Sequence, residues 1–185
     1  MALATVVAVR GSTYRRPGAR LLVPEHGTPV GNLSGGCLEG DVADIARIVM
    51  DEGTPRLASW DLTADDDAVW GMGLGCNGAI DVFIEPAAQT VGIAAALRSA
   101  SEHERPICVV TVIGSDTAGV STGARLVVAP DGEGTGGSLG TSELDAAAAD
   151  AAAEARACAR VSPVVPRHAM TCSARPVSRR PRRSV

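Results

Sequence analysis

The sequence VVAVRGS, residues Val6–Ser12, returns in related form as VVTVIGS, residues Val109–Ser115. A second match follows each copy, GARLLVPEHG over Gly18–Gly27 and GARLVVAPDG over Gly123–Gly132, and in both copies a glycine and a leucine then precede a helical run. The β-branched stretches and the glycine-containing turns predict two units of strand, turn, strand, loop and helix. This repeat determines how the rest of the sequence is interpreted.

The duplicated units cover residues 5–50 and 108–155. Apolar residues at helical spacing from Val42 to Val49 predict the first helix, and DAAAADAAAEARA predicts the second. Between the copies, PRLASWDL and AIDVFIEP are typical of strands and VGIAAALRSA of a helix. We therefore expect one α/β domain over residues 1–155, with a mixed sheet built from the two strand-turn-strand-helix units and flanking helices. The paired strands within each unit are close enough in sequence to form hairpins.

Composition restricts the class of protein. Hydrophobic residues make up 45% of the 185 residues but aromatic residues only 2%, so the core has to be built from Val, Ile, Leu and Ala. The start, MALATVVAVRGS, has no charged leading segment and too short an apolar run for a signal peptide or a membrane span, which predicts a cytoplasmic protein. Five cysteines without a CxxC pair, and three scattered histidines, argue against a disulfide framework and against a zinc site.

Charge divides the chain into two parts. All 17 basic residues are arginines; nine of them and all 21 acidic residues precede residue 156, so residues 1–155 carry a net charge of −12 and residues 156–185 carry +8. The basic tail has no apolar periodicity and is interrupted by proline and arginine, which predicts disorder or a frameshifted C-terminus. It has no aromatic residue to stack on bases and no amphipathic face. Binding to nucleic acid or to a membrane is therefore not expected.

The copies differ in the segment Gly31–Val42, GNLSGGCLEGDV, where only the first has a cysteine. Gly35 and Gly36 allow a tight, open turn, and Cys37 then falls at or near the start of a helix. Unpaired backbone N–H groups there favour a thiolate, an oxyanion or a phosphate. The alternative is a small buried hydrophobic residue, which is what a free cysteine usually is.

A second glycine-rich segment, GMGLGCNGAI, contains Gly75 and Cys76. It matches the GxGxxG dinucleotide pattern literally, but it precedes a strand instead of opening a helix, so it does not predict a Rossmann site. A packed turn is the structural alternative for Cys76. Cys108 begins a predicted strand and is expected in the core, and the acidic run Asp65–Asp67 fits a solvated helix start better than a metal site.

Arginines cluster in RGSTYRRPGAR, with Arg15 and Arg16 at the centre of the predicted hairpin loop. In an acidic protein body this is a local positive patch, and arginine side chains bind phosphate through two parallel hydrogen bonds. A solvated hairpin loop explains the same residues without a ligand.

The chain resembles the N-terminal domain of the XdhC/CoxI family of accessory proteins for molybdenum hydroxylases. Three segments in this order carry the resemblance: GSTYRRPGARLLV, GNLSGGCLE and WGMGLGCNGAIDVFIEP. The resemblance runs from about residue 5 to residue 86 and continues more weakly to about residue 155. It implies a non-enzymatic accessory protein that binds molybdenum cofactor (molybdopterin), helps it to receive its sulfido ligand, and delivers it to an apoenzyme of the xanthine dehydrogenase or carbon monoxide dehydrogenase type. Implied partners are this molybdenum hydroxylase, a sulfur donor of the cysteine desulfurase type, and a second copy in a homodimer.

The resemblance also implies which residues bind the cofactor. Cys37 falls in the family's SGGC segment and Cys76 in its GCGG segment, where Asn77 replaces a glycine. The implied cofactor-binding set is Arg15, Arg16, Gly35, Gly36, Cys37, Gly75 and Cys76. The Rossmann-like domain that usually follows in the family has no counterpart in residues 156–185, so the chain is expected to be truncated. Two alternatives stay open: a docking module for the hydroxylase or the sulfur donor that holds no cofactor, and a thiol enzyme with Cys37 as nucleophile.

Overall fold

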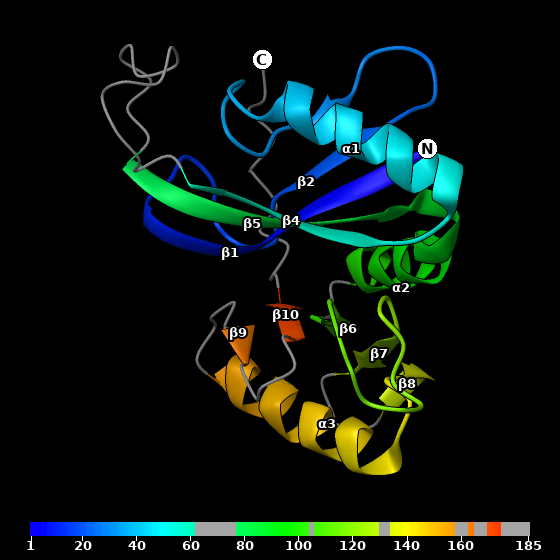
Figure 1. The fold of residues 1–185 in the computed structure, drawn as a ribbon. Coiled ribbons are helices and arrows are strands. Elements are labelled where there is room, and N and C mark those ends of the chain that lie inside the picture. The colour runs from blue at the N-terminus through cyan, green and yellow to red at the C-terminus, as the bar shows by residue number, and fades with distance from the viewer. Residues whose placement is uncertain (62–76, 104–105, 130–133, 158–162, 165–169, 175–185) are drawn as a thin grey trace, which may run out of the picture.

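The structure is a computed structural model that describes residues 1–61, 77–103, 106–129, 134–157, 163–164 and 170–174 (Figure 1). The first unit contains β1 (Ala2–Ser12), β2 (Arg20–Val23), β3 (Val30–Gly31), α1 (Glu39–Glu52), β4 (Arg56–Asp61) and β5 (Asn77–Pro86). The second contains β6 (Cys108–Val112), β7 (Arg125–Val128), β8 (Gly134–Ser138), α3 (Ser142–Ala157), β9 (Pro163–Val164) and β10 (Met170–Ala174). A 3₁₀ turn η1 (Ala87–Thr90) and α2 (Val91–Glu102) connect them.

The two units have the same topology. The strand order is β3-β2-β1-β5-β4 in one sheet and β8-β7-β6-β10-β9 in the other. Equivalent backbone bonds close the first hairpin of each unit: the Val6 N–H donates to the Ala19 carbonyl at 2.9 Å, and the Val112 N–H donates to the Ala124 carbonyl at 2.9 Å. The predicted duplication is confirmed, but these bonds make Val6 equivalent to Val112 and not to Val109, so the two matched sequences are out of register by three residues. The repeated unit is also longer than the sequence indicated, because it includes the two strands that follow each helix.

The predicted α/β class is confirmed, but the sheet differs from the single mixed sheet that we expected. The strands form two separate five-stranded sheets, and every strand pair within the described residues is antiparallel. The physical reason lies in the connections. Short loops join β1 to β2, β2 to β3 and β6 to β7, and such hairpins produce antiparallel pairs, whereas a parallel pair needs a long crossover. The β1–β5 and β6–β10 pairs are also antiparallel, although a helix and a further strand separate their members in the chain.

Each sheet covers its outer face with one helix (Figure 1). In the first unit, alternate residues of β1 pack with β5 and with the apolar side of α1, and Val6, Val42 and Val82 are fully buried there. In the second unit, β6 and β7 pack in the same way on the alanine-rich α3. The inner faces are turned toward each other, with α2 between the units and a small cluster of Val7, Phe83 and Ile113 joining them. Among the described residues, no helix combines the length and the apolar character that crossing a membrane requires.

The tail differs from the expected unpacked segment. Met170–Ala174 forms β10 and pairs with the whole of β6 in antiparallel register, from Met170 opposite Val112 to Ala174 opposite Cys108. The expectation that residues 156–185 stay unpacked does not hold for this strand. Backbone pairing to an open strand edge needs no apolar periodicity, and β10 takes beside β6 the place that β5 takes beside β1.

Candidate functional site

The loop between β3 and α1 is organised by the carboxylate of Glu39, the first residue of α1. Its Oε1 accepts hydrogen bonds from the backbone N–H groups of Leu33 and Ser34, both at 3.0 Å. Its Oε2 accepts from the Gly36 N–H at 3.0 Å and from the Ser34 hydroxyl at 2.5 Å. One side chain therefore holds three amides and one hydroxyl of the turn that precedes the helix, in the manner of a capping box.

These hydrogen bonds change the acidity of Glu39. Partial burial alone raises the pKa of a carboxyl group, but donation from the Ser34 hydroxyl and from the Ser34 and Leu33 amides outweighs it and lowers the pKa of Glu39 from 4.5 to about 2. Glu39 is therefore ionised at neutral pH. Its negative charge lies where the N-terminal end of the helix dipole favours one.

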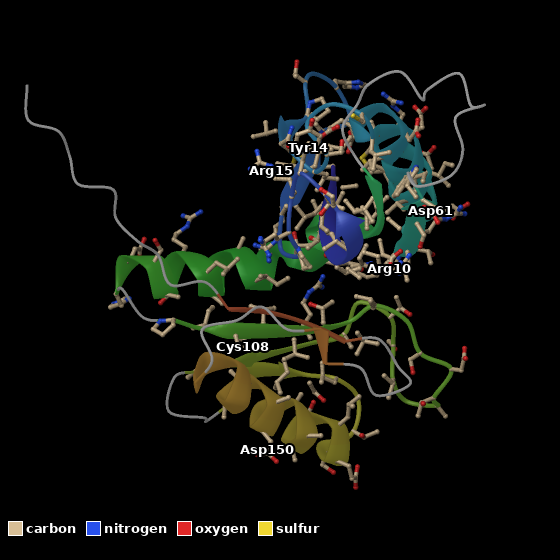
Figure 2. The ribbon with its side chains drawn as sticks, turned by 90° about the vertical axis from the view of Figure 1, so that its left-hand side faces the viewer. Arg10, Tyr14, Arg15, Asp61, Cys108 and Asp150 are labelled. Carbon is tan, nitrogen blue, oxygen red and sulfur yellow. The ribbon has the colours of Figure 1, made fainter. Side chains whose placement is uncertain are left out.

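Asn32 connects this loop to the arginine-rich hairpin loop. Its side-chain oxygen accepts from Arg15 Nε at 3.0 Å and from the Gly35 N–H at 3.1 Å. The Tyr14 ring lies beside Gly35, where an added β-carbon would meet its Cγ at 3.5 Å. Figure 2 shows Tyr14 and Arg15 near one another on the first unit. The structure thus brings together Arg15, Gly35 and Gly36, which the sequence analysis assigned to one site.

Cys37 lies two residues before α1 begins, as a free and partly exposed thiol that packs against the first core. The loop differs here from our expectation of open backbone donors. The backbone amides of Leu33, Ser34 and Gly36 donate to the Glu39 carboxylate. The Gly35 amide donates to the Asn32 side chain, and the Leu38 amide donates to the Ser34 hydroxyl at 2.8 Å. An anion beside Cys37 would depend on side chains and not on these five amides.

The other predicted residues divide into two groups. Arg16 is exposed, and its side chain makes no hydrogen bond within the described part of the chain; its carbonyl accepts from the Ala19 N–H at 3.2 Å. Gly75 and Cys76 lie outside the described residues, as do Asp65–Asp67, so their relation to Cys37 stays a prediction. Cys108 is fully buried, as expected, but it takes part in a disulfide bond, which was not expected.

Sequence reasoning missed Glu39, Asn32 and Tyr14. A signal for Glu39 was present in the repeat, since each copy has an acidic residue six positions after its buried leucine. Leu139 N–H donates to Asp145 Oδ1 at 2.6 Å, as Leu33 N–H does to Glu39. Asn32 and Tyr14 have no comparable signal, because their roles depend on two loops that meet only in the folded chain. In the described residues, no group of three or more His, Cys, Asp and Glu side chains could hold a metal ion.

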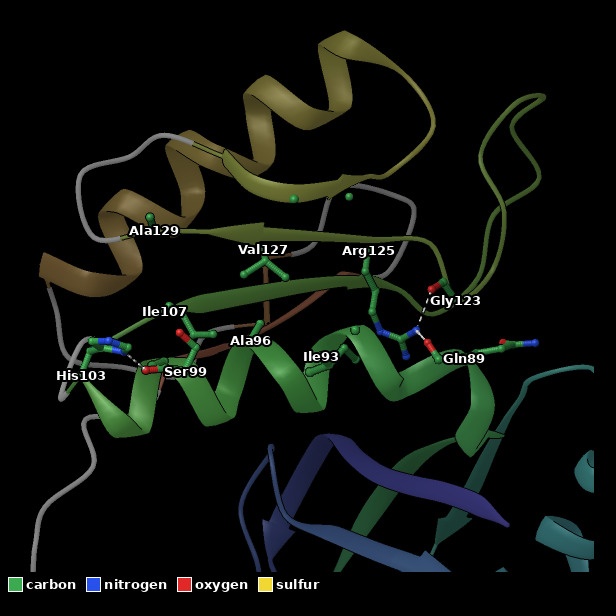
Figure 3. A pocket seen from close by; sticks show the side chains of 14 residues that line it. Gln89, Ile93, Ala96, Ser99, His103, Ile107, Gly123, Arg125, Val127 and Ala129 are labelled. Atoms are coloured by element: carbon green, nitrogen blue, oxygen red, sulfur yellow. Dashed lines mark hydrogen bonds between the residues drawn. The ribbon is translucent and has the colours of Figure 1, made fainter.

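A second feature lies between the units and was also not predicted. A cavity of about 740 Å³ separates α2 from β7 and β8, with Arg125 at one end and His103 at the other (Figure 3). Arg125 donates from Nη1 to the carbonyl oxygens of Gly123 at 2.9 Å and Gln89 at 3.3 Å, and from Nη2 to Glu85. Burial raises the pKa of Glu85, and Arg125 together with the charge of Arg20 offsets only part of this effect. The cavity walls are otherwise mostly small and apolar.

Comparison with known proteins shows what the chain is similar to. Residues 1–61 match the model of the XdhC and CoxI family. Over 83 residues, which are 45% of this chain and 25% of the relative, the chain is 47% identical to a Bacillus subtilis (strain 168) protein described as a probable xanthine dehydrogenase subunit. The structure of this chain is similar to a crystal structure described as a xanthine dehydrogenase from Bacillus halodurans, with a TM-score of 0.64 and 27% sequence identity.

That structural match covers 94% of this chain and 47% of the other, so the chain spans less than half the length of the proteins it resembles. The hairpin loop with Arg15 and the loop with Cys37 both fall inside the matched residues 1–61. Residues 1–61 therefore resemble the XdhC and CoxI family, and most of the chain has a fold similar to that of the Bacillus halodurans protein.

Proposed function

We propose that this chain is an accessory protein for a molybdenum hydroxylase of the xanthine dehydrogenase or carbon monoxide dehydrogenase type. It holds molybdenum cofactor during sulfuration and passes it to the apoenzyme, and it performs no hydroxylation itself. The descriptions of its relatives, which name xanthine dehydrogenase, support the choice of client enzyme. A cysteine desulfurase type of sulfur donor and a second copy of the chain are the further partners in this proposal.

The observation that carries the proposal is the link through Asn32, which holds Arg15 against the loop that bears Cys37. The site presents groups that suit the two ends of the cofactor. A thiol is a soft ligand for a metal centre, and guanidinium groups bind phosphate. Arg15 uses Nε for Asn32, and its two terminal nitrogens make no hydrogen bond to other described residues. The exposed ring of Tyr14 offers a flat apolar surface beside Gly35.

The chain's own residues then have separate roles. Arg15 and Arg16 bind the phosphate end, and Cys37 approaches the metal or dithiolene end. Glu39 and Asn32 position the loop by holding its amides. When bound, the cofactor supplies the molybdenum centre that accepts sulfur. Gly75 and Cys76 stay in the proposal as residues of the same site on the basis of the family resemblance alone.

Cofactor retention tests this proposal. The chain is purified from a host that makes molybdenum cofactor, and bound molybdenum and oxidised pterin fluorescence are measured together. We expect Cys37→Ala and Arg15→Ala each to lower retention at least about tenfold, since losing one charge-assisted contact costs roughly 1.5–3 kcal/mol. Arg47→Ala, which removes an exposed arginine paired with Asp44 on α1, is the matched control and should retain cofactor normally.

The alternative is a module that docks to the hydroxylase or the sulfur donor without cofactor. It is favoured by the five loop amides that already have partners within the protein and are therefore not available to an anion. The same preparations separate the two functions. Capture of the apoenzyme by cofactor-free protein, unchanged by Cys37→Ala and Arg15→Ala, would favour docking. Equal cofactor retention in all variants, with each variant folded by circular dichroism, would reject the cofactor-binding site.

A further inference from the structure

The side chain of Tyr14 lies flat on the loop that bears Cys37. A β-carbon built on Gly35 would lie 3.5 Å from Cγ, 3.6 Å from Cδ2 and 3.8 Å from Cδ1 of the Tyr14 ring. Three bonded ring atoms at nearly equal distances from one point place that point above the plane of the ring and not beside its edge. One face of the Tyr14 ring therefore covers Gly35.

Much of the remaining surface of Tyr14 is open to solvent. The residue is 62% exposed, although one face of its ring lies on Gly35 and it takes part in a further interaction within the chain. The exposed fraction already includes the effect of both contacts. Phe83, by contrast, is buried in the small cluster that joins the two units. Tyr14 therefore presents a planar apolar surface on the outside of the protein, at the candidate site.

Hydrogen bonds on both sides of Tyr14 fix the position of its ring. The Thr13 hydroxyl donates to the Arg15 carbonyl at 2.8 Å, which closes the turn across Tyr14. The Asn32 side-chain oxygen accepts from Arg15 Nε at 3.0 Å and from the Gly35 N–H at 3.1 Å. One atom thus ties the residue that follows the ring to the residue beneath it. A ring that is already held loses little conformational entropy when a ligand binds to it.

We infer that Tyr14 is the stacking residue of the candidate site, and that the ligand of this site carries a planar heteroaromatic ring joined to a phosphate group. The exposed face of Tyr14 binds the ring, and the terminal nitrogens of the adjacent Arg15 bind the phosphate. Aromatic side chains suit this role because every heteroaromatic ring has a π-face. The inference rests on the proposed function for the place of the site. The pterin of molybdenum cofactor and the base of a nucleotide share this chemistry.

Dissociation constants of four probes for the full chain, measured by calorimetry, test the inference. Three probes carry a ring and a phosphate: guanosine 5′-monophosphate, cytidine 5′-monophosphate, and the metal-free pterin phosphate obtained by oxidising the cofactor. The fourth, ribose 5-phosphate, has no aromatic ring and should bind more weakly to the wild type. We expect Tyr14→Leu to weaken binding of the ring-bearing probes about 5- to 100-fold, toward the level of ribose 5-phosphate, as the loss of one stack usually does.

Two further variants complete the series. Tyr14→Phe keeps the ring and should bind all four probes as the wild type does. Val91→Ala, which shortens a 66% exposed apolar side chain on α2, is the matched control and should also leave binding unchanged. Unchanged affinity for every ring-bearing probe in folded Tyr14→Leu would overturn the inference. So would the absence of saturable binding of these probes to the wild type.

Nuclear magnetic resonance provides a direct readout of stacking. The chain has one tyrosine, so carbon-13 labelling of tyrosine reports on Tyr14 alone. A heteroaromatic ring stacked on its face shifts the Tyr14 ring protons upfield, whereas contact through the phosphate alone leaves them nearly unchanged. We expect a saturable upfield shift that gives the same Kd as calorimetry. No shift at saturation would contradict stacking.

The outcomes also separate this inference from the proposed function. Tightest binding of the pterin phosphate would identify the cofactor as the source of the ring, and tightest binding of either nucleotide would identify a nucleotide. If only the proposed function fails, the chain retains no molybdenum and Cys37→Ala has no effect, while probe binding still depends on Tyr14. If only the inference fails, Cys37→Ala lowers cofactor retention and Tyr14→Leu does not.

Discussion

At the scale of single residues, Glu39 determines the shape of the loop that carries the candidate site. Its two carboxylate oxygens accept three backbone N–H groups and one hydroxyl, all within 3.0 Å. The helix has no side-chain hydrogen bond at its N-cap residue, Leu38, so this carboxylate takes the role that a capping side chain usually has. The equivalent acid of the second unit, Asp145, holds Leu139 in the same way.

We therefore expect Glu39→Gln to destabilise the protein. An amide has one acceptor oxygen in place of two and no charge, so several of the loop's donors lose their partner. The expected loss is about 2 kcal/mol in the free energy of unfolding, measured by urea denaturation at pH 7. Asp41→Asn is the control, because it removes the same charge from the same helix end at an exposed position. A similar loss in both variants would show that the helix dipole, and not the loop, is responsible.

The effect of Glu39→Gln should also depend on pH. The folded state lowers the pKa of Glu39 from 4.5 to about 2, so its carboxylate contributes stability that is fully present above pH 4.5. This contribution, at most about 3 kcal/mol by linkage and less because the loop is in contact with solvent, is lost as the pH falls toward 2. The difference between wild type and variant should therefore shrink over this range. A constant difference from pH 7 to pH 2 would contradict the assigned role.

At the scale of elements, one glycine in each unit allows the third strand to approach the second. Gly31 and Gly137 have φ values of +118° and +85°. A β-carbon on either would lie 2.2 Å from a backbone oxygen, that of Arg20 or that of Arg125. Both positions combine a backbone conformation that favours glycine with a contact against rigid main chain, so only glycine fits them. The repeat retains these glycines for a geometric reason.

Substitution of these glycines is expected to be severe. Gly31→Ala and Gly137→Ala should each cost about 3 kcal/mol or more, because the backbone has to move to make room for the methyl group. Gly40→Ala is the matched control: its position is helical, and an added methyl group meets nothing within 4 Å. It should be neutral or stabilising by up to about 1 kcal/mol. Thermal and urea unfolding of the three variants provide the comparison, and equal effects would contradict the steric explanation.

At the scale of the whole molecule, the Glu85–Arg125 pair links the two units across their inner faces. Glu85 is at the end of β5, Arg125 begins β7, and their side chains are 3% and 11% exposed. The same arginine also holds the start of the connecting segment through the Gln89 carbonyl, at 3.3 Å. A buried pair of this kind costs desolvation and adds little net stability, but it strongly disfavours the loss of one partner. It therefore fixes how the units face each other.

A double-mutant cycle tests this link. Glu85→Ala and Arg125→Ala should each destabilise the chain by about 3–5 kcal/mol, and the double variant should lose clearly less than the sum. The Glu52–Arg56 pair, with its N–O distance of 2.7 Å and both side chains nearly half exposed, is the control cycle. Its coupling energy should stay within about 1 kcal/mol. Additive losses at Glu85 and Arg125 would show that the two residues act independently of each other.

The sequence by itself determined the repeated unit and its local elements. The match of VVAVRGS with VVTVIGS, and of GARLLV with GARLVV, predicted equivalent hairpins, and the helical spacing from Val42 to Val49 predicted α1. These features depend on neighbouring residues in the chain, through side-chain periodicity and turn chemistry, and both can be read in sequence. The proximity of Arg15 to the Gly35–Cys37 turn followed from the family resemblance and not from such a pattern.

Only the tertiary structure decided the remaining features. Arg125 and Glu85 are 40 positions apart, β10 pairs with β6 from a segment without apolar periodicity, and Asn32 joins two loops 17 positions apart. The loop amides that the sequence analysis assigned to an anion donate to Glu39 and Asn32. These outcomes depend on which edges, faces and side chains meet after the chain has folded. No local propensity encodes them, because each partner's environment is made by residues distant in sequence.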